Sequence, residues 1–303
     1  MKPPPASRPQ SPSQLLQQKV SSLQPTHKLV QAKTTDSVLE GFQQLIDNKV
    51  LSIPLYSVQK QRYIGFLDIL DILHHFLQTL SPANPQQGFQ AFQEKFAGVS
   101  CEEVSDLSGA NPFKSIDVAA PVQSAISLLC NWKVRRVPLV DIDGSLQHVL
   151  SQSFIVRYLA RYVQLFPFVD STVGSLKLGH KEELYTISED ALVKDAFSLM
   201  RDHNISGVGV TDTHGNLVGT MSVTDLKHIG YSQEIFSKCF LKISQFLGQA
   251  GKKNLVVVDS EATVGRVAQI FSTTGLHRIF VVEGSKPIGV ISLFDFLQLF
   301  DTK

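Results

Sequence analysis

The chain has 303 residues and a formal net charge of +1, with 28 Lys and Arg against 27 Asp and Glu. This balance gives no reason to expect nucleic acid or a membrane surface as a partner. No apolar stretch reaches the roughly 18 residues that a membrane-spanning helix needs. Its 3 cysteines are widely spaced and form no CxxC motif, which argues against a disulfide framework. We expect a soluble, cytoplasmic protein, with the nucleus as a second location, and room for two domains of ordinary size.

Residues 1–28 are rich in Pro, Ser and Gln and lack an apolar core of the signal-peptide type. They predict a disordered leader, with a short helix near Leu15 and Leu16. The remainder divides into four repeats of similar pattern and the segments between them. The repeats are 29–80, 114–166, 184–231 and 254–301; an insertion (81–113, with a helical stretch Phe89–Phe96), a linker (167–183) and a connector (232–253) separate them.

Each repeat begins with an amphipathic helix, followed by two β-runs and a second apolar helix. In the last three repeats, apolar residues at offsets 0, +3, +4 and +7 predict one buried helix face. The first helices begin at Val38, Val122, Val193 and Val264. The last residue of the junction between the second strand and the second helix lies 33, 32, 32 and 31 residues further along the chain. So constant a register indicates an internal repeat. Because one unit is too small to bury its own faces, two must pair, and four imply two pairs of an α/β fold built from α+β repeats.

The junction between the second strand and second helix spans residues 68–71, 151–154, 222–225 and 292–295. In repeats three and four it has the pattern hydroxyl-x-x-Asp, given by Ser222 with Asp225 and Ser292 with Asp295. A carboxylate can accept both hydrogen bonds of a vicinal diol, and the helix start adds free N–H groups. A plain capping box explains the same pattern. Two matches in register favour a ribose site, and both roles can coexist.

The first two repeats depart from this pattern. Repeat one keeps Asp71 but has Asp68 in place of the hydroxyl, and a second carboxylate there would repel a phosphate. Repeat two ends in Phe154, which cannot hold a diol. We therefore expect at most three competent sites, with the best in the second half of the chain.

The unit resembles the cystathionine-β-synthase-type (CBS) repeat. A chain with four of them resembles the gamma subunits of the AMP-activated protein kinase family and its plant and fungal relatives, over about residues 29–301. The junction carries the resemblance, together with a basic pair, His277-Arg278, that leads into the first β-run. The resemblance implies two CBS pairs (Bateman modules) packed as a disc. It also implies that the junction Asp holds ribose hydroxyls and that the basic pair faces phosphates.

Repeat two has Arg135-Arg136 in the place of the basic pair, which keeps positive charge for phosphates, although a solvated strand edge is the alternative. Repeats one and three have Leu51-Ser52 and Ile205-Ser206 there and supply no cation. Ser52 and Ser206 could contact base or ribose, or bond their own backbone. The resemblance also places His180, in the loop before repeat three, beside the adenine. Gly65, Gly219 and Gly289 recur in the second β-run, which suits either a close ligand or tight packing.

The resemblance implies reversible binding of AMP, ADP or ATP without turnover. It also implies that the protein controls a Ser/Thr kinase through a catalytic subunit and a scaffold (beta-type) subunit. The sequence has no P-loop, Rossmann fingerprint, catalytic elbow or zinc motif, so we expect neither an enzyme nor a metal site. Two binding alternatives stay open: a CBS regulator of another target, and an interaction scaffold with weak or no nucleotide binding.

Overall fold

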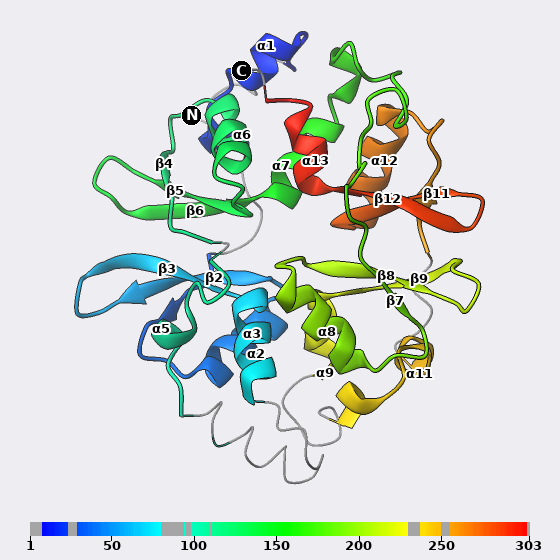
Figure 1. The fold of residues 1–303 in the computed structure, drawn as a ribbon. Coiled ribbons are helices and arrows are strands. Elements are labelled where there is room, and N and C mark those ends of the chain that lie inside the picture. Colours follow the sequence, from blue (N-terminus) through cyan, green and yellow to red (C-terminus); the bar gives the residue numbers. More distant parts are fainter. Residues whose placement is uncertain are drawn as a thin grey trace.

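The computed structural model describes residues 8–23, 29–79, 94, 98–109, 111–229, 237–249 and 255–301. Four three-stranded sheets lie toward the centre of a disc, and the helices cover its outside (Figure 1). Each repeat contributes one sheet, so the predicted four-fold repetition is confirmed. Within the described part of the chain, no helix combines the length and apolarity that crossing a bilayer requires.

The repeats share one order of elements. Repeat one comprises β1 (Ala32–Lys33), α2 (Val38–Asp47), β2 (Ser52–Ser57), β3 (Arg62–Asp68) and α3 (Ile69–Thr79). Repeat two comprises β4 (Ile116–Asp117), α6 (Val122–Asn131), β5 (Arg136–Val140), β6 (Leu146–Ser151) and α7 (Gln152–Ala160). Repeat three comprises β7 (Thr186–Ser188), α8 (Val193–Asp202), β8 (Gly207–Thr211), β9 (Leu217–Ser222), the 3-10 turn η3 (Val223–Asp225) and α9 (Leu226–Ile229). Repeat four comprises β10 (Val257–Val258), α12 (Val264–Thr274), β11 (Arg278–Glu283), β12 (Lys286–Ser292) and α13 (Leu293–Gln298).

Each sheet contains one strand that the sequence pattern does not predict. A strand of two or three residues precedes the first helix and pairs in parallel with the next strand, which then pairs antiparallel with the third. These short strands are β1, β4, β7 and β10. They are too short to show an alternating pattern, and only the parallel partner across the helix defines them.

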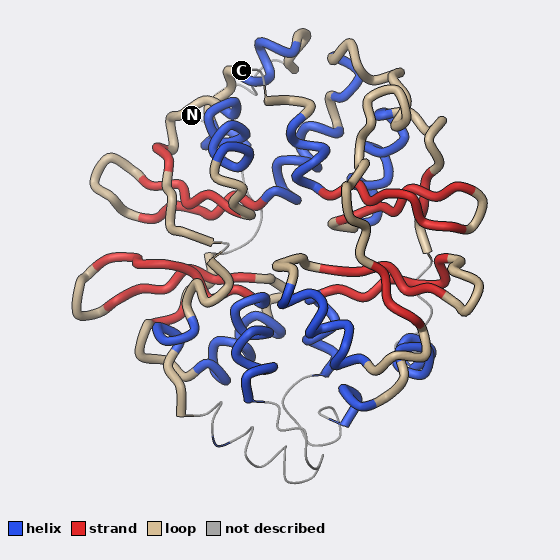
Figure 2. The backbone as a smooth tube through the Cα atoms, in the orientation of Figure 1, coloured by secondary structure: helices blue, strands red, loops and turns tan. Residues whose placement is uncertain are grey.

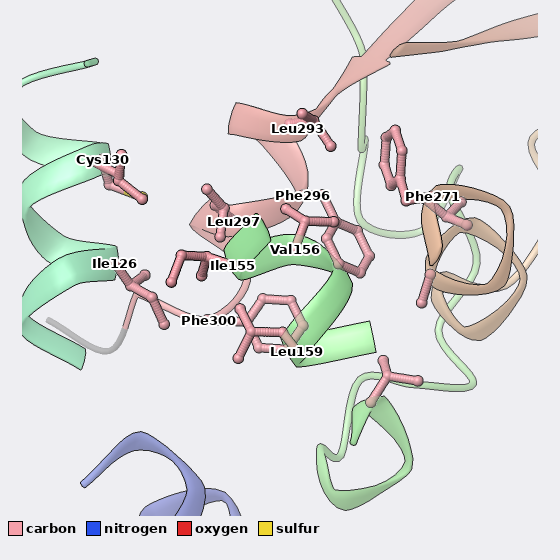
Figure 3. Close-up of a cluster of buried hydrophobic side chains, with 14 of the residues drawn as sticks. Ile126, Cys130, Ile155, Val156, Leu159, Phe271, Leu293, Phe296, Leu297 and Phe300 are labelled. Carbon is pink, nitrogen blue, oxygen red and sulfur yellow. The ribbon is translucent and has the colours of Figure 1, made fainter. Parts of the chain in front are cut away.

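Two apolar cores join the repeats crosswise. The predicted helix faces are buried, and those of repeats one and three form one core while those of repeats two and four form the other. Figure 3 shows part of the second core, in which Ile126 and Cys130 of α6 lie on the same cluster as Phe296 and Leu297 of α13. Burying each such side chain contributes roughly 1.5–3 kcal/mol. The helices therefore hold the two halves of the chain together.

The sheets join the repeats in consecutive order instead. Figure 2 shows the strands of repeat one opposite those of repeat two, and those of repeat three opposite those of repeat four. Leu217 of β9 packs with Phe280 and Val282 of β11 in a small apolar cluster across the second of these interfaces. The chain thus forms four similar α/β units in two pairs, as predicted, and each pair meets through its sheets.

A connecting segment covers the start of the first helix in every repeat. The N–H groups of a helix's first turn lack intrahelical partners, and here a connector carbonyl accepts the first one. The bonds run from Val38 to Val99 (2.9 Å), Val122 to Gln18 (2.8 Å), Val193 to Leu241 (3.0 Å) and Val264 to Ser171 (3.0 Å). The supporting segments include α5 (Cys101–Val104) on repeat one and α11 (Ile243–Gln249) on repeat three.

The predicted disorder of residues 1–28 is wrong for residues 8–23. The short helix α1 (Pro12–Leu16) forms with Ser11 as its N-cap, and a 3-10 turn, η1 (Val20–Leu23), follows. Leu15, Leu16 and Val20 are buried in the core of repeats two and four. This segment packs on repeat two in the same way as linker residues 171–174 pack on repeat four. Its contacts with the core therefore order it despite its polar composition. Apart from Glu94, the predicted helix Phe89–Phe96 lies outside the described residues.

The recurring glycines lie where the segments between the repeats pack closely on the sheets. A Cβ added at Gly65 would lie 2.7 Å from Ser105 Oγ, and one at Gly289 would lie 2.7 Å from the Gly179 carbonyl oxygen. At Gly219 it would lie 2.8 Å from Leu247 Cδ1. All three contacts belong to segments that connect the repeats. Close packing of these segments on the sheet therefore explains the glycines.

Candidate functional site

The Ser-x-x-Asp junctions of repeats three and four form capping boxes. Asp225 Oδ2 accepts hydrogen bonds from the N–H (2.7 Å) and hydroxyl (3.1 Å) of Ser222. Asp295 Oδ2 accepts the same pair from Ser292, at 2.8 and 2.6 Å. Each cap directs one carboxylate oxygen into the helix start and fixes the side-chain rotamer. Both predicted caps therefore form, through one oxygen of each carboxylate.

The two carboxylates differ in their surroundings. Asp225 is 1% exposed, and its charge partly offsets the lowering of the Arg278 pKa by burial, which places it within electrostatic reach of that guanidinium. Asp295 is more accessible, and its Oδ1 lies 2.6 Å from the ammonium of Lys181. The sequence did not predict a role for Lys181, because the Lys181–Asp295 ion pair joins residues 114 positions apart and no local pattern indicates it. The neighbouring His180, the predicted adenine-side residue, is exposed.

The junction of repeat one is closed by the chain itself. Asp71 is fully buried, and its Oδ1 accepts the backbone N–H of Ser108 at 2.9 Å. Ser105 Oγ donates to the Phe66 carbonyl at 3.1 Å, and the Phe113 ring packs on Phe66 at 5.3 Å. Burial, and secondarily the charge of Asp68, raises the pKa of Asp71 to about 7. In this state, the Ser108 N–H occupies one carboxylate oxygen of Asp71.

Asp68 is neutralised instead of standing free to repel a phosphate. Its Oδ2 accepts a 2.6 Å hydrogen bond from Arg136, and Arg135 lies 3.7 Å from its Oδ1. Arg136 is 8% exposed, and its guanidinium also lies 5.6 Å from the centre of the Phe66 ring. The alternative of a solvated strand edge is therefore wrong for Arg136. Breaking such a buried pair from one side is costly, because the remaining charge loses its partner.

The predicted phosphate-contact residues of repeats two and four gather near one another. We call Arg135, Arg136, Arg157, His277 and Arg278 the central basic cluster. Burial first, and then the four arginines, lowers the pKa of His277 to about 4. Burial and Arg135 lower the pKa of Arg278 to about 10. His277 is thus neutral near pH 7, and Arg157 of α7 is a member that sequence reasoning missed. A cluster whose positive charges disfavour one another is suited to an anion.

Backbone hydrogen bonds correct the predicted alignment of repeat three. In every repeat, the backbone N–H of the junction's second residue donates to the carbonyl of the residue that precedes the first of the two long strands. These bonds run from Ile69 to Leu51 (2.9 Å), Gln152 to Arg135 (2.9 Å), Val223 to Ser206 (3.1 Å) and Leu293 to His277 (3.2 Å). The equivalent of His277-Arg278 is therefore Ser206-Gly207, one residue beyond the predicted Ile205-Ser206. A one-residue shift is hard to detect in a short apolar run.

The corrected alignment explains Gly207. Arg278 Nη2 donates to Ser206 Oγ at 2.7 Å, and its guanidinium lies over Gly207, where an added Cβ would overlap it. The absence of a side chain in repeat three thus makes room for the cation of repeat four. At the equivalent position of repeat one, Ser52 Oγ is buried and has no hydrogen-bond partner among the described residues. The alternative that Ser52 bonds its own backbone is therefore not realised.

The CBS domain family model matches residues 173–230 and 247–301. These matched segments, in the second half of the chain, are CBS domains. The chain is similar to human 5'-AMP-activated protein kinase subunit gamma-3, with 25% identity over 281 residues that cover 89% of this chain and 56% of that protein. It is also similar to SNF1-related protein kinase regulatory subunit gamma-1 of Arabidopsis thaliana, with 24% identity over 329 residues that cover 88% of this chain and 77% of that protein.

The chain spans about half the length of the mammalian relatives that it matches. A solved structure from Methanocaldococcus jannaschii, presented as a proposed archaeal homologue of g-AMPK, has a TM-score of 0.76 at 16% identity. It covers 93% of this chain and 99% of that one, so the two share one fold. Among the described residues, no group of three or more His, Cys, Asp and Glu side chains is arranged to hold a metal ion.

Proposed function

We propose that this CBS-domain protein binds AMP, ADP or ATP reversibly and regulates a Ser/Thr protein kinase complex without catalysing a reaction. One observation supports the proposal above the others. Capped carboxylates that suit a ribose diol lie at helix starts in repeats three and four, and Asp225 is in electrostatic reach of the central basic cluster. The arrangement offers hydrogen-bond acceptors for a sugar and positive charge for phosphates within one region.

Within this proposal, the junctions of the second half bind nucleotide, with Asp225 and Asp295 as ribose acceptors. Arg278 and His277 contact phosphates, Arg135 and Arg157 add positive charge, and His180 and Ser206 line the base or ribose. AMP and ATP then compete for shared pockets. A ligand changes the activity of the complex only if it binds one conformation better, and such coupling is typically worth about 1–3 kcal/mol.

The kinase partners are inferred from the relatives, which are named as kinase subunits. By analogy with them, we propose a kinase catalytic subunit and a beta-type scaffold subunit as partners. Co-purification of a kinase whose activity responds to AMP would support this assignment. Stable co-purification with another enzyme would favour the CBS regulator of a different target.

A second candidate function is an interaction scaffold with little nucleotide binding. The contacts in repeats one and two favour the scaffold, because Asp71 accepts a hydrogen bond from Ser108 and Arg136 is paired with Asp68. Two of the four repeats thus use their site positions for internal contacts. This candidate predicts that the chain binds its partner equally well with and without nucleotide.

Calorimetric titration of the full chain with AMP, ADP and ATP tests the proposal. Asp225→Asn and Asp295→Asn remove the charge but keep a carbonyl acceptor for the cap, and Asp170→Asn, in an exposed position, is the matched control. We expect saturable binding that either junction variant weakens at least tenfold and the control leaves unchanged. A ligand at 100 times its Kd should also raise the free energy of unfolding by about 2.7 kcal/mol. Neither heat nor thermal stabilisation at millimolar nucleotide would refute isolated binding and favour the scaffold.

A further inference from the structure

The Asp295 carboxylate of repeat four already has most of its acceptor positions filled. Oδ2 accepts the N–H and the hydroxyl of Ser292, and Oδ1 accepts the ammonium of Lys181 at 2.6 Å. A carboxylate offers about four lone-pair positions. A vicinal diol needs two of them and finds one, so a sugar can bind through both hydroxyls only if one existing partner leaves.

Lys181 is the partner that leaves most easily. The Ser292 bonds belong to a capping box that spans four residues, and they stabilise the start of α13. The Lys181 side chain is 33% exposed, and its ammonium can move to water on a flexible four-carbon stem. Exposed ion pairs contribute only about 0.2–1 kcal/mol. Displacing Lys181 therefore costs less than opening the cap.

The backbone beside Lys181 is held over this site. Gly179 has a φ of +77°, and its carbonyl accepts the N–H of Val290 on β12 at 2.9 Å. A side chain at Gly179 would collide with the backbone of Ile291. The linker is thus fixed to repeat four two residues before Lys181, and the following residues lead directly into β7 of repeat three. Lys181 connects the repeat-four junction to the chain that enters repeat three.

We propose that Lys181 is a latch on the repeat-four ribose site. In the ligand-free protein its ammonium takes the position on Asp295 that a ribose hydroxyl requires, and a ligand with a vicinal diol displaces it. Displacement frees residues 180–183, so that occupation of repeat four alters the segment leading into repeat three. This inference rests on the proposed nucleotide binding and makes Lys181 a specificity-determining residue for that site.

Lys181→Met keeps the length of the side chain and removes its charge. Lys177→Met is the matched control, because Lys177 lies in the same linker with an exposed side chain. Both are compared in an Asp225→Asn background, which leaves repeat four as the principal site of the second half. AMP and 2'-deoxy-AMP are titrated by calorimetry, since only AMP has the vicinal diol that competes with the latch.

We expect Lys181→Met to raise the affinity for AMP about two- to fivefold, the equivalent of one exposed ion pair. The affinity for 2'-deoxy-AMP and the effect of Lys177→Met should change much less. Adding Asp295→Asn should abolish the gain. A fall in AMP affinity, or an equal gain for both nucleotides, would overturn the latch while leaving nucleotide binding intact. If neither the wild-type chain nor any variant binds, the proposed function fails and the latch fails with it.

Discussion

Asp71→Asn should stabilise the protein more at pH 8 than at pH 5. Burial and Asp68 raise the pKa of Asp71 from 3.8 to about 7. The folded protein therefore holds this proton more tightly than the unfolded chain does, and stability is lost as the pH rises from about 4 toward 7. Above pH 7 the penalty is complete. The amide of the variant would not titrate, and its carbonyl oxygen can still accept the Ser108 N–H.

The size of the effect follows from the interval between the two pH values. Each pKa unit corresponds to 1.36 kcal/mol. The pKa of Asp71 in the folded protein, about 7, lies roughly two pH units above pH 5. The free-energy penalty of ionising Asp71 therefore grows by about 2–3 kcal/mol as the pH rises from 5 to 8. The new amide has its own cost of burial, but that cost is the same at both pH values. The difference in ΔΔG between the two pH values therefore isolates the carboxylate.

Urea unfolding of the wild type, Asp71→Asn and the exposed control Asp170→Asn at pH 5 and pH 8 measures this difference. Linear extrapolation gives the free energy of unfolding at each pH, provided that the slopes agree. We expect Asp71→Asn to gain about 2–3 kcal/mol on the wild type between pH 5 and pH 8, and the control to gain almost nothing. An equal ΔΔG for Asp71→Asn at both pH values would refute the argument that a buried, charged Asp71 strains repeat one.

Three further predictions concern other parts of the molecule. AMP binding at pH 6 should take up more protons in the wild type than in His277→Gln, because burial and then the arginines lower the pKa of His277 to about 4, and a bound phosphate offsets the arginines. Calorimetry in buffers of different ionisation enthalpy measures the uptake, and equal uptake by the two proteins would contradict this reasoning. Gly207→Ala should displace Arg278 and weaken AMP binding about tenfold, while adenosine binding, which needs no phosphate contact, stays nearly constant. Leu15→Ala should destabilise the chain by about 2–5 kcal/mol in urea unfolding, and the exposed control Gln14→Ala by much less; equal effects would contradict docking of the N-terminal segment.

Local patterns in the sequence determined the repeating units. The spacing of apolar residues identified the four helix faces that are buried, since a helix brings residues three and four apart onto one side. The Ser-x-x-Asp pattern identified the helix starts, because a capping box is completed within four residues. The basic pair at His277-Arg278 was also evident, and its neighbours in repeat two lie in the same cluster.

Only the tertiary structure decided what those units contact. The ordering of residues 8–23 depends on buried contacts with repeat two, and the closure of Asp71 depends on Ser108, 37 residues away. The Asp68–Arg136 and Asp295–Lys181 pairs join positions 68 and 114 residues apart. Such contacts leave no periodic trace in the sequence, because they depend on how whole repeats pack and not on the geometry of one helix or strand. The sequence therefore indicated the residues that we propose bind a nucleotide, whereas the packing of the repeats determined which of them already contact other parts of the chain.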